Sequence, residues 1–250
     1  MLAEQRYNEI IKLLEERGNI TVGELTVLLH ASEATVRRDL ASLDKTGKLK
    51  KVFGGAVLPE KSDFMTKDTE IGDRELINVN EKRRIAEYAA RLIKEDDFVY
   101  IDAGSTTGFL ADFINQKKAV YVTNGVGIAR KLAKRGFDVI LLGGNLKYST
   151  DAVTGATAVA NLLKYRFTIG FWGTNGIDLK TGYTTPDSDE AAVKRVSMEQ
   201  TGRRYVLCDH DKFGVKSMVS FGNYDSAKII TDRIGSPEFE GKENIKETGL

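Results

Sequence analysis

Two stretches of this chain carry side chains and spacings suited to ligand recognition. The first covers residues 32–40 and reads SEATVRRDL, with hydroxyl and guanidinium groups set between apolar positions. The second covers residues 102–107 and reads DAGSTT, a glycine followed by three hydroxyl side chains. Adjacent arginines on a helix can contact the phosphates and base edges of DNA. A glycine and hydroxyls at the start of a helix favour an anion, most naturally a phosphate group.

The first stretch has the pattern of a helix that begins after Ser32. The Ser32 hydroxyl can cap the free amides of the first turn, and Gly47 is placed to end the helix. Val36, Leu40 and Leu43 form an apolar stripe for packing, which leaves the opposite face to polar residues.

Two further helices are expected before this one. The first covers residues 3–17, and the second opens with a capping box at 21–24 and runs to about 29. With a tight turn at 30–31, the pattern predicts a helix-turn-helix whose last helix enters the major groove of DNA.

A short β-hairpin, or wing, is expected next. Residues 48–53 and 56–58 are strand-like, and the glycine pair at 54–55 permits a turn. Between residues 37 and 51 lie six basic and two acidic side chains, a local charge of +4 in a chain whose net charge is +1. A solvated helix face would also explain this cluster, but beside a helix-turn-helix it favours a phosphate-contacting surface. The candidate DNA-binding residues are Ser32, Thr35, Arg37, Arg38, Lys45, Lys48, Lys50 and Lys51.

The chain is expected to form two domains. Residues 1–58 would be the winged helix-turn-helix, and residues 59–79, which show no sustained period, a linker. Residues 80–235 alternate between strands and helices, which predicts a mainly parallel α/β sheet covered by helices on both faces. The expected strands are 98–101, 119–123, 139–142, 167–172, 205–208 and 228–231, and the expected helices are 80–94, 107–116, 126–134, 156–164 and 189–200. The polar tail at 236–250 is expected to fray.

Polar residues follow several of these strands. Ligands bind at the carboxyl ends of strands in such folds, where amides, a lysine, carboxylates and asparagines would suit a sugar phosphate. The candidate effector-binding residues are Asp102, Gly104, Ser105, Thr106, Thr107, Asn124, Asn175, Glu190, Lys194, Asp209 and Lys212. Two simpler interpretations stay open: the 102–107 loop as an ordinary turn capped by Ser105, and Glu190 with Lys194 as a surface ion pair.

Composition argues against several other classes. The 102–107 loop lacks the lysine of a nucleotide P-loop, and no dinucleotide fingerprint follows a strand, so no cofactor is expected. One cysteine and two histidines are too few for a cysteine and histidine metal site. No apolar run approaches the roughly 18 residues that cross a bilayer, so a cytoplasmic protein without membrane contact is expected.

The N-terminal pattern resembles that of the DeoR family of bacterial transcription regulators. The matching residues are Arg6, Ile10, Leu14, Ser32, Thr35, Val36, Arg37, Arg38, Asp39, Leu40, Gly54, Gly55 and Ala56. The family usually has arginine and histidine before the glycine pair, where this chain has Lys51 and Phe53. A lysine still meets a phosphate, but it lacks the planar two-point contacts of arginine.

The resemblance extends over essentially the whole chain and implies a sensor domain similar to ribose-5-phosphate isomerase. It implies that the 104–107 loop holds a phosphate and that the other candidates line the sugar. The isomerase needs closely spaced aspartates after an inner strand, whereas this chain reads GTNGID at 173–178, which favours binding without turnover. The alternative is an isomerase-like enzyme with an appended DNA-binding domain.

The expected function is therefore a DNA-binding regulator, most simply a repressor of a carbohydrate-utilisation operon; the sequence leaves an activator open. Its partners would be double-stranded operator DNA, a sugar-phosphate effector and further copies of itself, as a homodimer or homotetramer. Residues 171–176 and 184–187 resemble regulators of fructose utilisation, which suggests fructose 1-phosphate as the effector.

Overall fold

The structure is a computed structural model that describes residues 2–58, 64–66 and 70–249. It divides into two compact units. The smaller unit lies within residues 1–62 and 72–79, and the larger within residues 63–71 and 80–250. Each unit has its own hydrophobic core, so we describe them separately.

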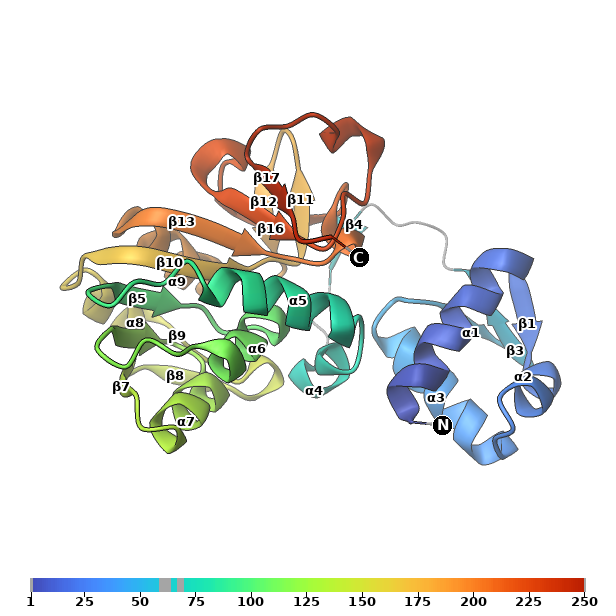
Figure 1. Cartoon of the computed structure of the whole chain (residues 1–250). Helices are drawn as coiled ribbons and strands as arrows, with labels where there is room; N and C mark the ends of the chain where they lie inside the picture. Colours follow the sequence, from blue (N-terminus) through green and yellow to red (C-terminus); the bar gives the residue numbers. More distant parts are fainter. Residues whose placement is uncertain (1, 59–63, 67–69, 250) are drawn as a thin grey trace. The chain divides into compact units, whose positions relative to one another are not determined.

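The smaller unit is a helix-turn-helix with a three-stranded antiparallel sheet (Figure 1). Its helices are α1 (Ala3–Arg17), α2 (Val22–Leu28) and α3 (Glu33–Lys45), and α4 (Ile71–Glu75) lies at the boundary between the units. Its strands are β1 (Asn19–Thr21), β2 (Lys50–Val52) and β3 (Gly55–Val57), in the order β1-β3-β2. The side chains of Ile10, Leu14, Leu25, Val36 and Leu40 pack between these elements in one core.

The helix boundaries follow the expected local signals. Gly18 ends α1 in a left-handed conformation with φ of 76°. Thr21 and Glu24 form the capping box of α2, in which the Glu24 amide donates to the Thr21 hydroxyl over 3.2 Å. The Ser32 hydroxyl accepts from the Thr35 amide over 3.3 Å and so caps α3.

The wing differs from its expected form in two ways. The predicted first strand included Phe53, but β2 ends at Val52, and Phe53 with Gly54 forms the turn. Gly55 was expected in the turn but lies in β3, where a Cβ would collide with the Ile20 carbonyl oxygen. The third strand, β1, was not predicted, because its pairing with β3 joins segments about 35 residues apart.

The larger unit is built on a seven-stranded sheet within the described residues, in the order β17-β16-β13-β10-β5-β6-β7. All six strand pairs are parallel. The strands are β5 (Phe98–Ile101), β6 (Val120–Thr123), β7 (Asp138–Leu141), β10 (Phe167–Gly173), β13 (Thr201–Leu207), β16 (Lys228–Thr231) and β17 (Ile245–Glu247). The prediction of a parallel α/β sheet is confirmed.

Helices cover both faces of this sheet (Figure 1). They are α5 (Val79–Ala90), α6 (Ser105–Phe113), α7 (Val126–Lys134), α8 (Ala156–Leu162) and α9 (Ser188–Glu199). One core contains side chains of α5, α6 and α7, such as Ile85, Leu110 and Leu132. The other contains side chains of α8 and α9, together with the buried Trp172.

Smaller sheets and 3-10 turns complete the larger unit. They comprise β4 (Phe64–Met65) with β14 (Lys216–Ser217), β8 (Asn145–Lys147) with β9 (Ala152–Thr154), and β11 (Gly176–Asp178), β12 (Gly182–Thr185) and β15 (Val219–Gly222). The 3-10 turns are η1 (Tyr148–Thr150), η2 (His210–Lys212), η3 (Tyr224–Ser226) and η4 (Pro237–Phe239).

Two expectations about irregular segments need correction. The expected linker at 59–79 contains β4 and α4, and residues 59–63 and 67–69 of it lie outside the described residues. The expected fraying of the tail is wrong for the described part, because β17 pairs with β16 and Phe239 is fully buried. For the residues described, no helix has the length and apolar character needed to cross a membrane. Within the same residues, no group of His, Cys, Asp or Glu side chains is arranged to hold a metal ion.

Candidate functional site

Most candidate DNA-binding side chains lie on the surface of the smaller unit. Ser32, Arg37 and Arg38 are exposed at the start and middle of α3, whereas Thr35 is half-buried beside Ser32. The lysines continue this surface along the chain: Lys45, Lys50 and Lys51 are exposed, and Lys48 is half-buried. A series of cations that begins on α3 and continues into the wing suits a DNA backbone.

The two arginines of α3 differ in their partners. The Arg37 guanidinium donates to Glu33, four residues earlier, over 2.6 and 2.8 Å. Arg38 has no ion-pair partner among the described residues. Arg38 therefore presents an uncompensated charge, while Glu33 fixes the direction of Arg37.

A buried ion pair fixes α3 on α1. The Arg6 guanidinium donates to both carboxylate oxygens of Asp39, over 2.6 and 3.1 Å. Asp39 is almost fully buried. The hydrogen bond between Arg6 and Asp39 raises the pKa of the Arg6 guanidinium above the ordinary value for arginine. Because the pair joins two helices, it sets the position from which α3 presents its exposed face.

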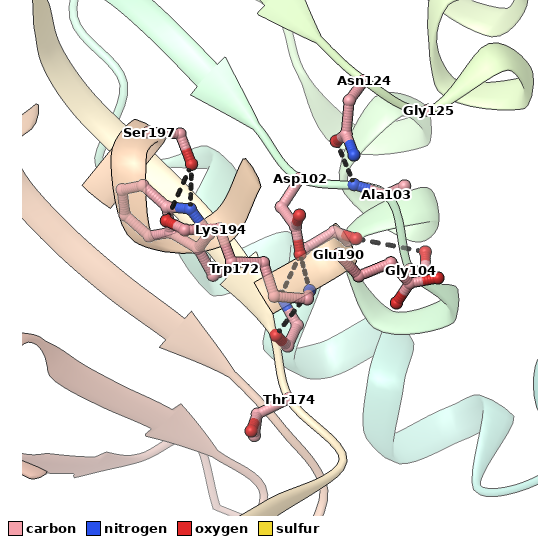
Figure 2. A network of polar contacts seen from close by, with 12 residues as sticks. Asp102, Ala103, Gly104, Asn124, Gly125, Trp172, Thr174, Glu190, Lys194 and Ser197 are labelled. Carbon is pink, nitrogen blue, oxygen red and sulfur yellow. Dashed lines mark hydrogen bonds and ion pairs between the residues drawn. The ribbon is translucent and has the colours of Figure 1, made fainter. Parts of the chain in front are cut away.

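In the larger unit, Asp102 lies at the carboxyl end of β5 and contacts Lys194 on α9 (Figure 2). The Asp102 carboxylate also accepts from the Gly173 amide over 3.1 Å, and the Lys194 ammonium donates to the Gly173 carbonyl over 3.1 Å. Both side chains are almost fully buried. Burial raises the pKa of the Asp102 carboxyl above its ordinary value, although the Lys194 charge acts in the opposite direction.

Glu190 lies one turn before Lys194 on α9 but binds different residues. The Glu190 carboxylate accepts from the Thr150 hydroxyl over 2.6 Å and from the Lys147 ammonium over 3.0 Å. Lys147 also binds Asp187, the cap of α9, over 3.0 Å. The simpler interpretation of Glu190 and Lys194 as a surface ion pair is therefore wrong. Each one faces a buried partner from a distant part of the chain.

Asn124 holds the ends of neighbouring strands together. Its side-chain oxygen accepts from the Ala103 amide over 2.8 Å (Figure 2). The same oxygen accepts from the Tyr100 hydroxyl over 3.2 Å. Its amide donates to the Val153 carbonyl over 3.3 Å. These contacts fix the backbone just before the 104–107 loop.

The 104–107 loop opens α6 without an internal acceptor. Gly104 is the N-cap and offers no side chain, and the Thr107 hydroxyl donates to the Gly104 carbonyl over 3.1 Å. Among the described residues, the amides of Ser105, Thr106 and Thr107 have no hydrogen-bond acceptor. Three such amides at a helix start form a positive site for an anion.

Two of the other helices that begin at this edge, α7 and α9, are capped by carboxylates of the chain itself. Asp151 accepts from the Gly127 amide at the start of α7 over 2.6 Å. Asp187 accepts from the Glu190 amide at the start of α9 over 2.9 Å. Helix α6 begins without a carboxylate of the chain, and α8 likewise begins at Gly155 without a side-chain cap.

Comparison with known sequences identifies both units. Residues 6–62 match the family described as DeoR-like helix-turn-helix domain, and residues 77–233 match that described as DeoR C terminal sensor domain. The chain belongs to the DeoR family. It is therefore a DNA-binding transcriptional regulator rather than an enzyme.

DeoR-family relatives match along nearly the whole chain. The regulator FruR of Bacillus subtilis, named as uncharacterized, is 39% identical over 92% of this chain and 91% of its own. The regulator GlpR of Haloferax volcanii is 32% identical over 100% of this chain and 97% of its own. The lactose phosphotransferase system repressor of Staphylococcus aureus is 33% identical over 87% of this chain and 86% of its own.

Among solved structures, ribose 5-phosphate isomerase A of Methanocaldococcus jannaschii aligns with a TM-score of 0.41 and 15% identity. The alignment covers 54% of this chain and 55% of that chain.

The remaining candidates of the DeoR sensor unit occupy the same edge of the sheet but make separate contacts. Asn175 follows β10, and its amide nitrogen lies 3.8 Å from the Met65 sulfur. Asp209 follows β13, is almost fully buried and caps η2, which contains the half-buried Lys212.

The sequence interpretation missed the residues that position the candidates. Lys147, Thr150 and Asp187 surround Glu190, and Asp151 occupies the start of α7. Thr150 and Asp151 end η1, where Asp151 has φ of 53°. One sequence signal could have indicated this role of Asp151. Helix α7 begins at Gly125, which has no side chain to cap the helix, so a residue from elsewhere in the chain has to do so.

Proposed function

We propose that this DeoR-family chain is a repressor whose binding to operator DNA is controlled by a phosphorylated sugar. On the DNA side, Arg37 and Arg38 of α3 contact the major groove, with Ser32 and Thr35 at the start of the helix beside them. The lysines Lys45, Lys48, Lys50 and Lys51 add sequence-independent contacts to phosphates. Two copies of the chain would present α3 to two half-sites.

The observation that carries the effector proposal is the open start of α6. The amides of Ser105, Thr106 and Thr107 have no acceptor among the described residues, whereas carboxylates of the chain occupy the starts of α7 and α9. A phosphate has the charge and the acceptor oxygens to bind these three amides. The strand-end loop 104–107 therefore supports a phosphate site.

Polar groups beside the loop would recognise the sugar. Asp102 lies at the end of β5, and Lys194 contacts it from α9, the helix that also carries Glu190. Because Asp102 already compensates the charge of Lys194, the proposed phosphate depends mainly on the amides of α6. Asn175, Asp209 and Lys212 extend the same edge and are proposed as outer contacts to the sugar, with Asn124 supporting the loop from behind.

Fructose 1-phosphate is the first effector to test. The resemblance of residues 171–176 and 184–187 to regulators of fructose utilisation supports it. Because other relatives carry different names, such as GlpR and the lactose phosphotransferase system repressor, the test includes further sugar phosphates.

The experiment is a thermal-shift screen of the full chain with fructose 1-phosphate, other sugar phosphates, the matching free sugars and inorganic phosphate. A ligand that binds only the folded state raises the unfolding temperature by mass action. We expect stabilisation by one phosphorylated sugar and none by its free form. The same compound is then added to the protein bound to a DNA duplex, and release is expected. Stabilisation by free sugars alone would contradict the phosphate site, and tighter DNA binding would contradict an effector that relieves repression.

A further inference from the structure

The wing of the smaller unit carries an exposed aromatic side chain at its tip. Phe53 has a relative exposure of 108%, so no part of the described chain covers its ring. Val52 beside it is also exposed, and Lys50 and Lys51 precede it on β2. An apolar tip on a basic hairpin is poorly suited to phosphate contact alone, because the ring carries no charge.

The turn that bears Phe53 is held in place by three features. Gly54 adopts φ of 81°, a conformation that other residues rarely adopt. The Gly54 carbonyl accepts from the Val22 amide at the start of α2 over 2.9 Å. Gly55 packs against β1 so closely that a Cβ would collide with the Ile20 carbonyl oxygen. The exposure of Phe53 is therefore a property of a fixed turn.

The wing also starts on the exposed face of α3 that carries Arg37. Arg37 and Asp44 are seven residues apart and lie on one face of the helix. The Asp44 carboxylate accepts from the Lys51 amide over 2.8 Å. This bond fixes β2 to the C-terminal end of the face that would enter the major groove, so the hairpin extends from the DNA-facing side of the unit.

We propose that Phe53 is an apolar wedge that enters the DNA minor groove next to the major groove occupied by α3. This inference rests on the proposed binding of operator DNA by α3. The three residues of β2 extend about 10 Å, enough to pass one phosphate backbone. Lys50 and Lys51 then meet that backbone, and the ring contacts the sugar and base edges beyond it. The affinity that the wedge adds depends on how easily the minor groove deforms and not on the charge of the DNA.

The test uses the full-length chain and a duplex that the unmodified protein selects from a random-sequence pool. Binding is measured by fluorescence anisotropy over a series of salt concentrations for Phe53→Ser, Phe53→Leu and Lys51→Ala. Leu163→Ser removes an exposed apolar side chain from the larger unit and serves as the control. Hydroxyl-radical footprinting reports the minor groove directly.

We expect Phe53→Ser to weaken binding by about tenfold without changing the salt dependence, because stacking and apolar contacts release no counterions. Phe53→Leu should retain most of the affinity, since leucine also acts as a wedge. Lys51→Ala should reduce the slope of log K against log salt by about 1. The Phe53→Ser footprint should lose protection beside each half-site, and Leu163→Ser should behave as the unmodified protein.

Several results would overturn the wedge. One is that Phe53→Ser binds DNA with the affinity or the footprint of the unmodified protein. Another is that Phe53→Ser loses affinity because the protein dissociates into smaller assemblies, which would place the ring in a contact between copies. If Lys51→Ala weakens binding while Phe53→Ser does not, DNA binding stands and the wedge alone fails. If the unmodified chain selects no duplex, the proposed DNA binding fails and the wedge with it.

Discussion

Lys194 and Asp102 form a buried ion pair that joins α9 to the carboxyl end of β5. The exposed fractions of the two side chains are 6% and 1%, so neither charge is compensated by solvent. The Gly173 backbone contacts both groups and adds the end of β10 to the cluster. Three elements of the sensor unit therefore meet at one pair of charges.

The first prediction concerns the stability of this pair. Lys194→Met leaves a buried, uncompensated carboxylate and should lower the free energy of unfolding of the larger unit by about 3 kcal/mol. The double variant Asp102→Asn with Lys194→Met should lose less than the sum of the single variants, because it leaves no isolated charge. Urea unfolding followed by Trp172, the only tryptophan and fully buried, reports this unit. Additive losses would contradict the coupling.

The second prediction separates the amides of α6 from its hydroxyls. Ser105→Pro removes one amide donor at a position where proline suits a helix, while Ser105→Ala removes only the hydroxyl. Gly104 is extended, with φ of 169° and ψ of 162°, which a following proline tolerates. Ser105→Pro should therefore weaken sugar-phosphate binding by about tenfold or more, and Ser105→Ala by less. Calorimetric titration with the compound found in the screen measures both.

An equal loss in both variants would place the phosphate on the Ser105 hydroxyl instead. The unfolding temperature without ligand is the control for helix α6. It should remain within a few degrees of that of the unmodified protein in both variants, because proline at the first helical position preserves the helix.

The third prediction concerns Lys147, which joins β8 to α9 through Asp187 and Glu190. Lys147→Met should increase amide hydrogen exchange in residues 145–154 by about fivefold, a local loss of about 1 kcal/mol. Lys164→Met, at an exposed lysine after α8, is the matched control and should leave this segment unchanged. Equal exchange in both variants would mean that the β8–β9 hairpin is held by its other contacts.

The fourth prediction is a dependence of stability on pH. Burial acts to raise the pKa of Asp97, but hydrogen bonds from Thr168, the Lys94 amide and Arg203 outweigh it and hold that pKa below its ordinary value. A carboxyl whose pKa is lower in the folded state stabilises that state above its unfolded pKa of about 4, and the stabilisation is lost as pH falls through the folded pKa.

Asp97→Asn should therefore cost about 2 kcal/mol at pH 7, and the difference from the unmodified chain should shrink in acid below about pH 4. Urea unfolding at pH 7 and at pH 3 to 4, followed by Trp172, measures both values. Asp138→Asn, at the exposed start of β7, is the control and should show little difference at either pH. A difference that grew in acid would reverse the assigned direction of the shift.

Much of the fold could be predicted because its signals are local. Ser32, Thr21 and Gly18 set helix boundaries through bonds within a few residues, and the alternation of strands and helices indicated the parallel sheet. Elements that depend on distant pairing were missed. The polar tail was expected to fray, yet β17 finds a partner in β16, and Phe239 enters the core.

The candidate site shows the same division. Residue types at strand ends indicated where polar groups would gather, and Asp102 and Lys194 do meet although they are 92 positions apart in the chain. Their pairing was not predictable, because Glu190 offered Lys194 a nearer partner at helical spacing. Burial decides which partner each side chain takes. Helix α9 turns Glu190 and Lys194 inward, where Lys147 and Thr150 bind Glu190 and leave Lys194 to Asp102.

The last prediction concerns the Glu33–Arg37 pair on α3. Glu33→Gln removes a negative charge from a surface proposed to face phosphates and frees the Arg37 guanidinium. Binding to a scrambled duplex should strengthen more than binding to the selected duplex, because an arginine without a fixed direction discriminates less between bases.

The matched control for Glu33→Gln is Glu87→Gln, since Glu87 and Arg91 form the same exposed pair in the larger unit at 2.6 Å. Arg38→Ala is a separate comparison and should weaken binding to the selected duplex by about 1 to 3 kcal/mol if Arg38 contacts a base. If Glu33→Gln and Glu87→Gln raise affinity equally for both duplexes, the effect is one of net charge alone and Glu33 has no part in directing Arg37.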